Sequence, residues 1–194
     1  MSTIGFDLDG VLADQTVLKV QKFKELYGLN LERWQVSSNV IDDYVPDKTI
    51  RRAVGKISGT TPHQEFVESA TPDYLSALVQ EGYQLHLVSR RGKSEEGIRS
   101  GYETIETLDL RRFFKDRINF CVTDDEKVRL LRQISCQWFI DDRVEVVDQL
   151  VGEIENPVLY DPFSLVEKGY VTPHNSATVV KSLSLIQNLA RGLK

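Results

Sequence analysis

Cysteine is scarce in this sequence: the 194 residues include only Cys121 and Cys136. Two thiols form no disulfide framework, so we expect a reducing, cytoplasmic environment. Both cysteines lie in apolar stretches with a strand-like pattern, which favours buried structural thiols over reactive ones.

Long apolar runs and an excess of positive charge are also absent. No stretch of about 18 apolar residues occurs, so no segment is predicted to span a membrane, and residues 1–3 lack the basic and apolar regions of a secretory signal. The chain has 24 Lys and Arg against 29 Asp and Glu, a net charge of -5. General nucleic-acid binding needs a basic surface, so the charge balance argues against a nucleic-acid partner. The lack of a long apolar run argues against a membrane partner. A small anionic substrate needs only one local positive site. No pattern bears on the oligomeric state.

What the sequence does contain is a set of short apolar runs that end in polar residues. Residues 3–6 are followed by Asp7, residues 83–88 by Ser89, and residues 137–140 by Asp141 and Asp142. Two weaker runs, at 118–122 and 157–160, complete a predicted set of five strands.

Helical patterns lie between these strands. Residues 72–81 follow Thr71 as a predicted N-cap and end at Gly82, and further helices are predicted at 124–134, 144–150 and 176–189. Strands that alternate with helices predict an α/β fold with a central parallel sheet covered on both faces. Ligands of such sheets bind beyond the carboxyl ends of the strands, where the polar residues above would converge.

Residues 15–70 interrupt this alternation, because their patterns are helical only. Helices are predicted at 15–27 with Gly28 as the stop, at 31–35, at 47–58 capped by Asp47, and at 61–69. We therefore expect a catalytic core formed by residues 1–14 and 71–194, and a helical cap subdomain, residues 15–70, inserted after the first strand.

The acidic residues at the strand ends predict a cation site. Alternate residues of a strand share a face, so Asp7 and Asp9 can point to one place, and Gly10 allows backbone amides to approach an anion closely. Bringing carboxylates to about 4 Å costs on the order of 4 kcal/mol per pair at an effective dielectric of 20. Hard oxygen ligands without His or Cys favour Mg²⁺ as the ion that offsets this repulsion, and phosphoryl transfer as the chemistry.

Four segments resemble, in order, the four motifs of the haloacid dehalogenase (HAD) superfamily of phosphatases. They are Asp7-Leu8-Asp9-Gly10-Val11, Leu87-Val88-Ser89, Lys127, and Ile140-Asp141-Asp142. The resemblance implies a Rossmannoid three-layer α/β/α sandwich with a small helical cap after the first strand. Residues 7–14 and Ser89-Arg90 are also similar to the branch of 5'-nucleotidases and deoxyribonucleotidases.

The resemblance also implies roles for individual residues. Asp7 would attack phosphorus, and Asp9 would serve as general acid and then base, which indicates phosphate ester hydrolysis because dehalogenating members lack this second acid. Lys127 would neutralise the nucleophile and the phosphoryl charge. Substrate would contact Gly10, Ser89 and Arg90, and Mg²⁺ would be held by Asp7, Asp9 through its carbonyl, Asp142 and Asp141, the last directly or through a water.

Several alternatives stay open at this point. Lys93 competes with Lys127, and Arg91 competes with Arg90 for substrate. Many relatives carry an acid or amide four residues after the metal ligand, where this chain has Val146 beside Glu145. A basic stripe at helical spacing, Arg51, Arg52 and Lys56, reads more readily as a solvated helix face than as a site for a second anionic group. The scattered His63, His86 and His174 receive no catalytic role.

The sequence thus predicts an enzyme, a cytoplasmic HAD-like phosphatase that uses Mg²⁺. It would hydrolyse a small phosphorylated metabolite or a mononucleotide through an aspartyl-phosphate intermediate. Two alternatives are a non-catalytic relative that binds a phosphorylated ligand and a phosphatase that acts on nucleic-acid ends.

Overall fold

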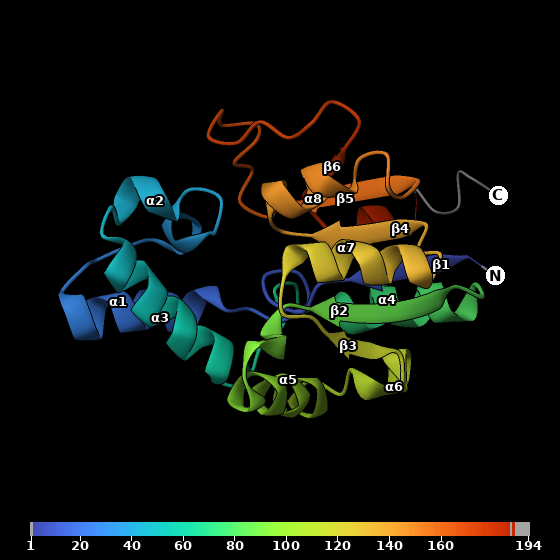
Figure 1. Cartoon of the computed structure of the whole chain (residues 1–194), viewed down its shortest axis with the longest axis horizontal. Helices are drawn as coiled ribbons and strands as arrows, with labels where there is room; N and C mark the ends of the chain where they lie inside the picture. The colour runs from blue at the N-terminus through green and yellow to red at the C-terminus, as the bar shows by residue number, and fades with distance from the viewer. Residues whose placement is uncertain (1, 187, 189–194) are drawn as a thin grey trace.

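The fold is built on one parallel sheet, seen in a computed structural model that describes residues 2–186 and 188. Its six strands lie in the order β3-β2-β1-β4-β5-β6, all parallel to their neighbours (Figure 1). The strands are β1 (Thr3–Phe6), β2 (Gln84–Ser89), β3 (Ile118–Phe120), β4 (Trp138–Asp141), β5 (Asn156–Tyr160) and β6 (Thr178–Val180). The predicted α/β fold with a parallel sheet is confirmed.

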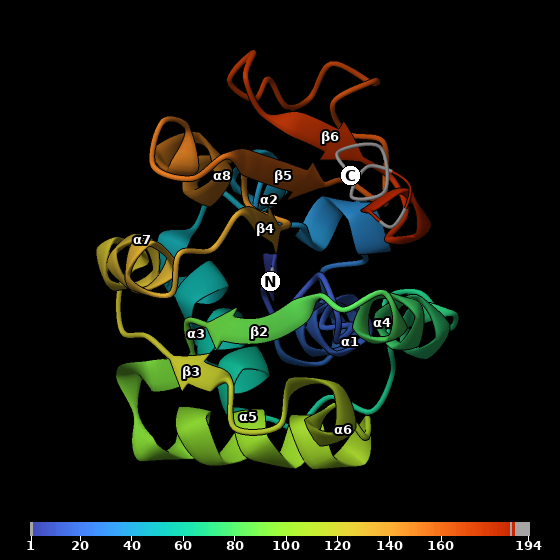
Figure 2. The ribbon, with the colours of Figure 1, turned by 90° about the vertical axis from the view of Figure 1, so that its right-hand side faces the viewer.

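Two apolar clusters cover the two faces of the sheet. On one face, Leu85 and Leu87 of β2 pack with α4 (Thr71–Gln80), α5 (Glu95–Thr107) and α6 (Arg111–Phe114). On the other, Val88 of β2 and Phe139 of β4 pack with α7 (Asp124–Gln133) and α8 (Val144–Leu150). Figure 2 shows α7 and α8 on the opposite side of the sheet from α4. Since neighbouring strand residues point to opposite faces, strands this rich in apolar residues require both layers.

The chain reverses its direction of travel across the sheet at β1. Phe6 of β1 lies beside Leu87 of β2 on one side and beside Ile140 of β4 on the other. The residues that follow these three strands therefore emerge side by side at the switch point, which is where open α/β sheets bind ligands.

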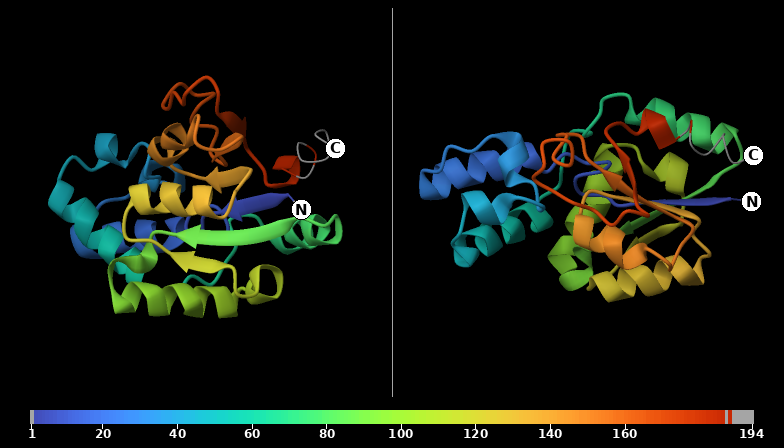
Figure 3. Two further views of the ribbon diagram at one scale, coloured as in Figure 1. Left: turned by 45° about the vertical axis from the view of Figure 1, so that its right-hand side comes forward. Right: turned by 90° about the horizontal axis from the view of Figure 1, so that it is seen from above.

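Helices of the segment between β1 and α4 lie beyond the carboxyl ends of the strands (Figures 1 and 3). They are α1 (Thr16–Tyr27), the 3₁₀ turn η1 (Arg33–Val36), α2 (Ile41–Tyr44) and α3 (Lys48–Thr60). Gly28 ends α1 in the left-handed conformation with φ 68°, and the Asp47 carboxylate caps α3 by accepting from the amides of Thr49 and Ile50. A separate apolar cluster around Phe23 and Val54 holds these helices together. The division into core and cap at residues 14 and 70 remains a prediction.

Two predicted helices are wrong. Residues 61–69 contain no helix; they form bends and a turn, and Phe66 forms an antiparallel bridge with Ala13. Pro62 explains this, because the residue before a proline avoids the helical region. In the predicted helix 176–189, Thr178–Val180 instead form β6 and pair with β5, and a short helical turn follows at 184–186. Residues 187 and 189 lie outside the described part of the chain.

Other helix boundaries shift without changing the topology. Helix α4 starts at Thr71, so Ala70 and not Thr71 is its N-cap, and the Thr71 hydroxyl donates to the carbonyl of Glu68. The segment predicted at 31–35 forms the 3₁₀ turn η1. The sequence reading missed α2, α5, α6 and the 3₁₀ turn η2 (Arg91–Lys93). Among the described residues, no helix is long and apolar enough to cross a bilayer.

Candidate active site

The centre of the site is a buried ion-pair network at the ends of β1 and β4. Asp7 follows β1, Asp141 ends β4, and the Lys127 ammonium lies between them, 2.7 Å from Oδ1 of Asp7 and 2.8 Å from Oδ2 of Asp141. All three are almost fully buried. Thr123 caps α7 by accepting from the amide of Glu126, which brings Lys127 to the sheet one turn into the helix. The structure thus brings Lys127, and not Lys93, against the two carboxylates.

A third carboxylate completes an acidic cluster. Asp7, Asp141 and Asp142 each offer an oxygen atom within 4.8 Å of the others. Gly10 makes room for Asp142, because it adopts φ +84° and a Cβ there would overlap the Asp142 carboxylate. From the segment between β1 and α4, called the cap segment from here on, Asn39 donates to the Asp142 carbonyl at 2.7 Å and accepts from the Val144 amide at 3.0 Å, which fixes the loop after β4.

The charges of this cluster are not balanced by the protein alone. Burial raises the pKa of Asp7 to about 7, with Asp141 and Asp9 adding to the rise and Lys127 opposing it. Burial and the neighbouring Asp141 and Asp7 hold the pKa of Asp142 well above its usual range. A divalent cation would stabilise the ionised carboxylates, and an all-oxygen donor set suits Mg²⁺. The residues present therefore fit the metal that the sequence predicts.

Ser89 ends β2 on the neighbouring strand. Its hydroxyl is buried and has no hydrogen-bond partner among the described residues. Because buried hydroxyls are normally paired, this orphaned donor is consistent with an anionic ligand that approaches the strand ends.

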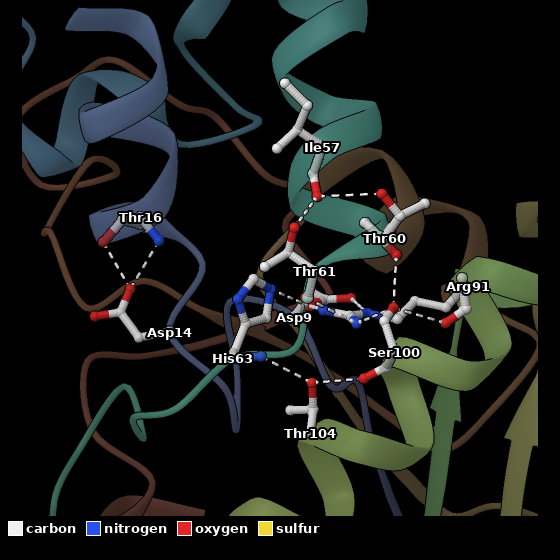
Figure 4. Close-up of polar contacts among 12 residues, drawn as sticks. Asp9, Asp14, Thr16, Ile57, Thr60, Thr61, His63, Arg91, Ser100 and Thr104 are labelled. Atoms are coloured by element: carbon white, nitrogen blue, oxygen red, sulfur yellow. Dashed lines mark hydrogen bonds and ion pairs between the residues drawn. The ribbon is translucent and has the colours of Figure 1, made fainter. Parts of the chain in front are cut away.

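Asp9 is held by two basic side chains (Figure 4). The Arg91 guanidinium donates from Nε to Oδ2 at 2.8 Å and from Nη2 to Oδ1 at 2.6 Å, and Nε2 of His63 lies 3.1 Å from Oδ1. Burial alone would raise the pKa of Asp9, but Arg91 and, to a smaller extent, His63 outweigh it and hold the pKa well below its usual range. Asp9 is therefore a carboxylate in this arrangement.

The same arginine ties Asp9 to the chain that returns from α3. Arg91 donates to the Ser100 hydroxyl at 2.8 Å and to the Thr61 carbonyl at 3.4 Å, and the Ser100 hydroxyl donates to the Gly59 carbonyl at 3.1 Å. The His63 amide donates to the hydroxyl of Thr104 at 2.9 Å (Figure 4). Residues 59–63, α5 and Asp9 thus form one hydrogen-bonded unit.

Sequence reasoning missed this unit. It assigned His63 no role, whereas His63 contacts Asp9, and it left Arg90 and Arg91 as alternatives. Arg91 is the one that binds Asp9, while Arg90 pairs with Asp124 at 2.6 Å. No local pattern marks these contacts, which join residues tens of positions apart.

The structure also shows where Val146 lies, at the position where many relatives carry an acid or amide, together with its neighbour Glu145. Val146 is fully buried in the cluster between α8 and the sheet, and Glu145 lies 3.7 Å from the guanidinium of Arg143. In the structure as it stands, neither joins the acidic cluster.

The site opens into a cavity of about 670 Å³ between the strand ends and the cap segment. Its floor includes Asp7, Asp9, Lys127 and Asp142, and Arg90 reaches its wall. A volume in this range suits a small-molecule ligand.

Comparisons with known proteins bear on the fold and on possible relatives. No protein-family model matches the chain. A Bacillus cereus (strain ATCC 14579) protein provisionally described as a nucleotidase is 25% identical over 163 residues, which cover 77% of this chain and 80% of the relative.

Solved structures of low sequence identity share the fold over almost the whole length. A Burkholderia xenovorans structure provisionally described as a haloacid dehalogenase-like hydrolase covers 99% of this chain and 98% of its own, with a TM-score of 0.60 at 12% identity. A Thermotoga maritima structure provisionally described as a beta-phosphoglucomutase reaches 0.60 at 17% identity, and the L-2-haloacid dehalogenase of Xanthobacter autotrophicus 0.56 at 12%; both cover 100% of each chain. The chain has the haloacid dehalogenase-like fold, which confirms the resemblance found in the four motifs.

Proposed function

We propose that this protein is a Mg²⁺-dependent hydrolase of small phosphate monoesters, with Asp7 as the nucleophile. The observation that carries the proposal is the buried contact of Asp7 with Lys127, which leaves the Asp7 carboxylate at the floor of an open cavity. Asp141 and Asp142 complete an oxygen cluster beside it. Fixed charges around a buried nucleophile suit phosphoryl transfer, because such sites work mainly by positioning and electrostatic stabilisation.

The first half-reaction forms an aspartyl phosphate. A carboxylate oxygen of Asp7 attacks phosphorus, the ester P–O bond breaks, and the leaving alkoxide takes a proton from Asp9. Lys127 stabilises the carboxylate before attack, and the Ser89 hydroxyl donates to a phosphoryl oxygen. Since Arg91 favours the charged form of Asp9, this step requires that Asp9 takes up a proton and leaves Arg91 when substrate binds.

The second half-reaction releases phosphate. Asp9, now a carboxylate, accepts a proton from water, and the water oxygen attacks phosphorus and displaces Asp7. The contacts of Asp9 with Arg91 and His63 favour this charged form.

Magnesium would be held by the carboxylates of Asp7 and Asp142, by Asp141 directly or through a water, and by the Asp9 carbonyl. When bound, it supplies positive charge that offsets the repulsion between these carboxylates and the phosphoryl oxygens.

The decisive experiment is hydrolysis of p-nitrophenyl phosphate. We expect turnover that needs Mg²⁺, is lost on chelation, and falls by at least about 10⁴ in Asp7→Asn, because the nucleophile is removed. Asp125→Asn, on the exposed first turn of α7, is the matched control and should retain wild-type activity. Turnover that survives in a folded Asp7→Asn protein would remove Asp7 as the nucleophile.

A nucleotidase is the second candidate function, favoured by the Bacillus cereus relative. A nucleoside monophosphate hydrolysed with a kcat/KM far above that of other phosphate monoesters would support it.

A further inference from the structure

Basic side chains outnumber acidic ones in the wall of the cavity. Eight basic and four acidic side chains line it, in a chain whose net charge is -5. Four of the basic groups are paired: Lys127 binds Asp7 and Asp141, Arg91 binds Asp9, and Arg90 and Arg143 share Asp124.

Three cations farther out are not matched. Arg52 and Lys56 of α3 and Lys93 of η2 line the cavity, and their side chains form no hydrogen bond or ion pair within the described part of the chain. We call them the cap-side cations. Lys19 also lines the cavity, but burial lowers the pKa of its ammonium group, with the nearby Asp142 and Asp9 opposing this shift.

The basic residues of α3 differ in their surroundings: Arg51 makes contacts within the cap segment, whereas Arg52 and Lys56 face the cavity. Arg51 pairs with Asp42 at 2.8 Å and donates to the Val45 carbonyl. Arg52 and Lys56, four residues apart, share the next face, where like charges repel each other. The sequence analysis interpreted these three residues as one solvated helix face. In the structure, Arg51 is paired within the cap segment, whereas Arg52 and Lys56 line the cavity.

Two glycines lie near Arg52 and Lys56 on α3. Gly55 and Gly59 also line the cavity, and a Cβ at either position would meet nothing within 4 Å. Room is therefore open beside the two cations, close to the helix backbone.

The cavity offers little to a nucleobase. None of its lining residues, all of which lie in the described part of the chain, has an aromatic ring. Trp34 and Tyr44 of the cap segment pack on each other, with ring centroids 5.2 Å apart, in a cluster with Leu165 and Val171. Stacking on aromatic rings, a common way to bind bases, is therefore not available here.

We propose that the cap-side cations bind a second anionic group of the substrate, so that the preferred substrates are small phosphate monoesters that also carry a carboxylate or a second phosphate. The inference rests on the proposed function: the ester phosphate meets the floor at Asp7, and the second anion meets Arg52, Lys56 and Lys93. Charge-assisted contacts of this kind are stronger than neutral hydrogen bonds.

Matched ligand pairs test the proposal. Glycerol 3-phosphate and 3-phosphoglycerate differ by a carboxylate, and fructose 6-phosphate and fructose 1,6-bisphosphate differ by a phosphate. We expect at least one pair to show a kcat/KM about tenfold higher for the more anionic member, and a preference that shrinks at high salt. Which pair discriminates identifies the second group.

Variants of α3 assign the preference to the cap-side cations. Arg52→Gln/Lys56→Gln should abolish the preference and leave p-nitrophenyl phosphate turnover within about twofold, while Lys48→Gln, exposed on the same helix and outside the cavity lining, should change neither. A preference that is absent, or that survives the double substitution, would overturn the inference. A strong preference for a nucleoside monophosphate that ignores these substitutions would do the same.

A binding measurement separates this inference from the proposed function. Calorimetric titration of the Asp7→Asn protein with 3-phosphoglycerate, glycerol 3-phosphate and the two fructose phosphates needs no turnover. Tighter binding of a more anionic member that is lost in the Arg52→Gln/Lys56→Gln background supports the anion site even if no phosphate ester is hydrolysed. Equal binding within both pairs would overturn the anion site even if the protein is an active phosphatase.

Discussion

The floor and the cap side of the cavity both carry basic side chains, but in opposite states. At the floor, Lys127 is buried and contacts two carboxylates at 2.7 and 2.8 Å. On the cap side, Arg52, Lys56 and Lys93 are exposed and have no ionic partner in the described chain. A charge that is already paired holds reacting groups in position, whereas a charge left unpaired in a cavity remains free to bind a ligand. The contrast separates the residues that we propose perform the chemistry from those that we propose select the substrate.

The largest effect on stability and activity is expected when one lysine is removed from each region. In Lys127→Met, two buried carboxylates lose their counter-charge, so we expect metal-free protein at about pH 8 to lose about 3–5 kcal/mol of unfolding free energy, and activity to fall about 10²–10³-fold. Urea denaturation and p-nitrophenyl phosphate assays measure the two effects.

The exposed lysine is the matched control. Lys93→Met should change stability by less than about 0.5 kcal/mol, because no ionic contact is lost. Similar losses in both variants would contradict the assignment of Lys127 to the floor.

A glycine substitution tests the acidic cluster of Asp7, Asp141 and Asp142. Gly10→Ala places a methyl group against the Asp142 carboxylate at φ +84°. We expect strain of about 1–3 kcal/mol and a loss of Mg²⁺ affinity of about 10–100-fold, measured by denaturation and calorimetric titration.

Gly28→Ala separates backbone strain from the clash. Gly28 also has a positive φ, but a Cβ there meets nothing within 4 Å. It should cost stability and leave Mg²⁺ affinity unchanged; equal loss of affinity in both variants would argue against the Asp142 contact.

A smaller effect is expected from the histidine beside Asp9. His63→Gln removes a basic contact that positions the acid, so we expect kcat for an alkyl phosphate to fall about tenfold with little change in KM. The loss should be smaller for p-nitrophenyl phosphate, because its leaving group needs less protonation. His174→Gln, on an exposed loop, should change neither rate. Equal losses for the two substrates would indicate a structural role for His63 alone.

The smallest effect concerns a second buried histidine, which has no part in either region. Burial, followed by the nearby Arg117, lowers the pKa of His86 below its usual 6.5, while Asp116 opposes this. The neutral form is therefore favoured by folding, and its contribution to stability is present above the unfolded pKa and lost as the pH falls through the lower, folded pKa. His86→Leu should flatten the acid side of the stability profile, measured by urea denaturation from about pH 7.5 downward. An unchanged slope would show that His86 does not titrate on unfolding.

The central strands of this fold could be predicted from the sequence because their local pattern agrees with their place in the tertiary structure. Asp7, Ser89 and Asp141 end apolar runs that can only be buried strands, and parallel strands bring their carboxyl ends together. Lys127 was expected only from the resemblance, with Lys93 left open; the structure brings it to the carboxylates because it lies one turn into a helix that Thr123 caps.

Elsewhere the tertiary context decided. Val179, Val180, Leu183 and Ile186 repeat at helical spacing, but pairing with β5 turned the β-branched start of this segment into β6. Helix α5 had a readable start, since Ser94 caps it and two glutamates occupy its first turn. The contact of His63 with Asp9 had no signal in the sequence, because the two residues lie on different segments and no spacing rule connects them.

The return segment from α3 carries a consequence for protein engineering. Thr61 and His63 belong to the chain that re-enters the core, yet they are tied to Arg91, Thr104 and Asp9. A chimera that exchanges helices α1 to α3 alone would keep the contacts of Thr61 and His63. One that exchanges the whole of residues 15–70 would also remove His63, which contacts Asp9, the carboxylate that we propose transfers protons. A chimera that carries the corresponding helices of another protein should therefore have its junction at or before Thr60.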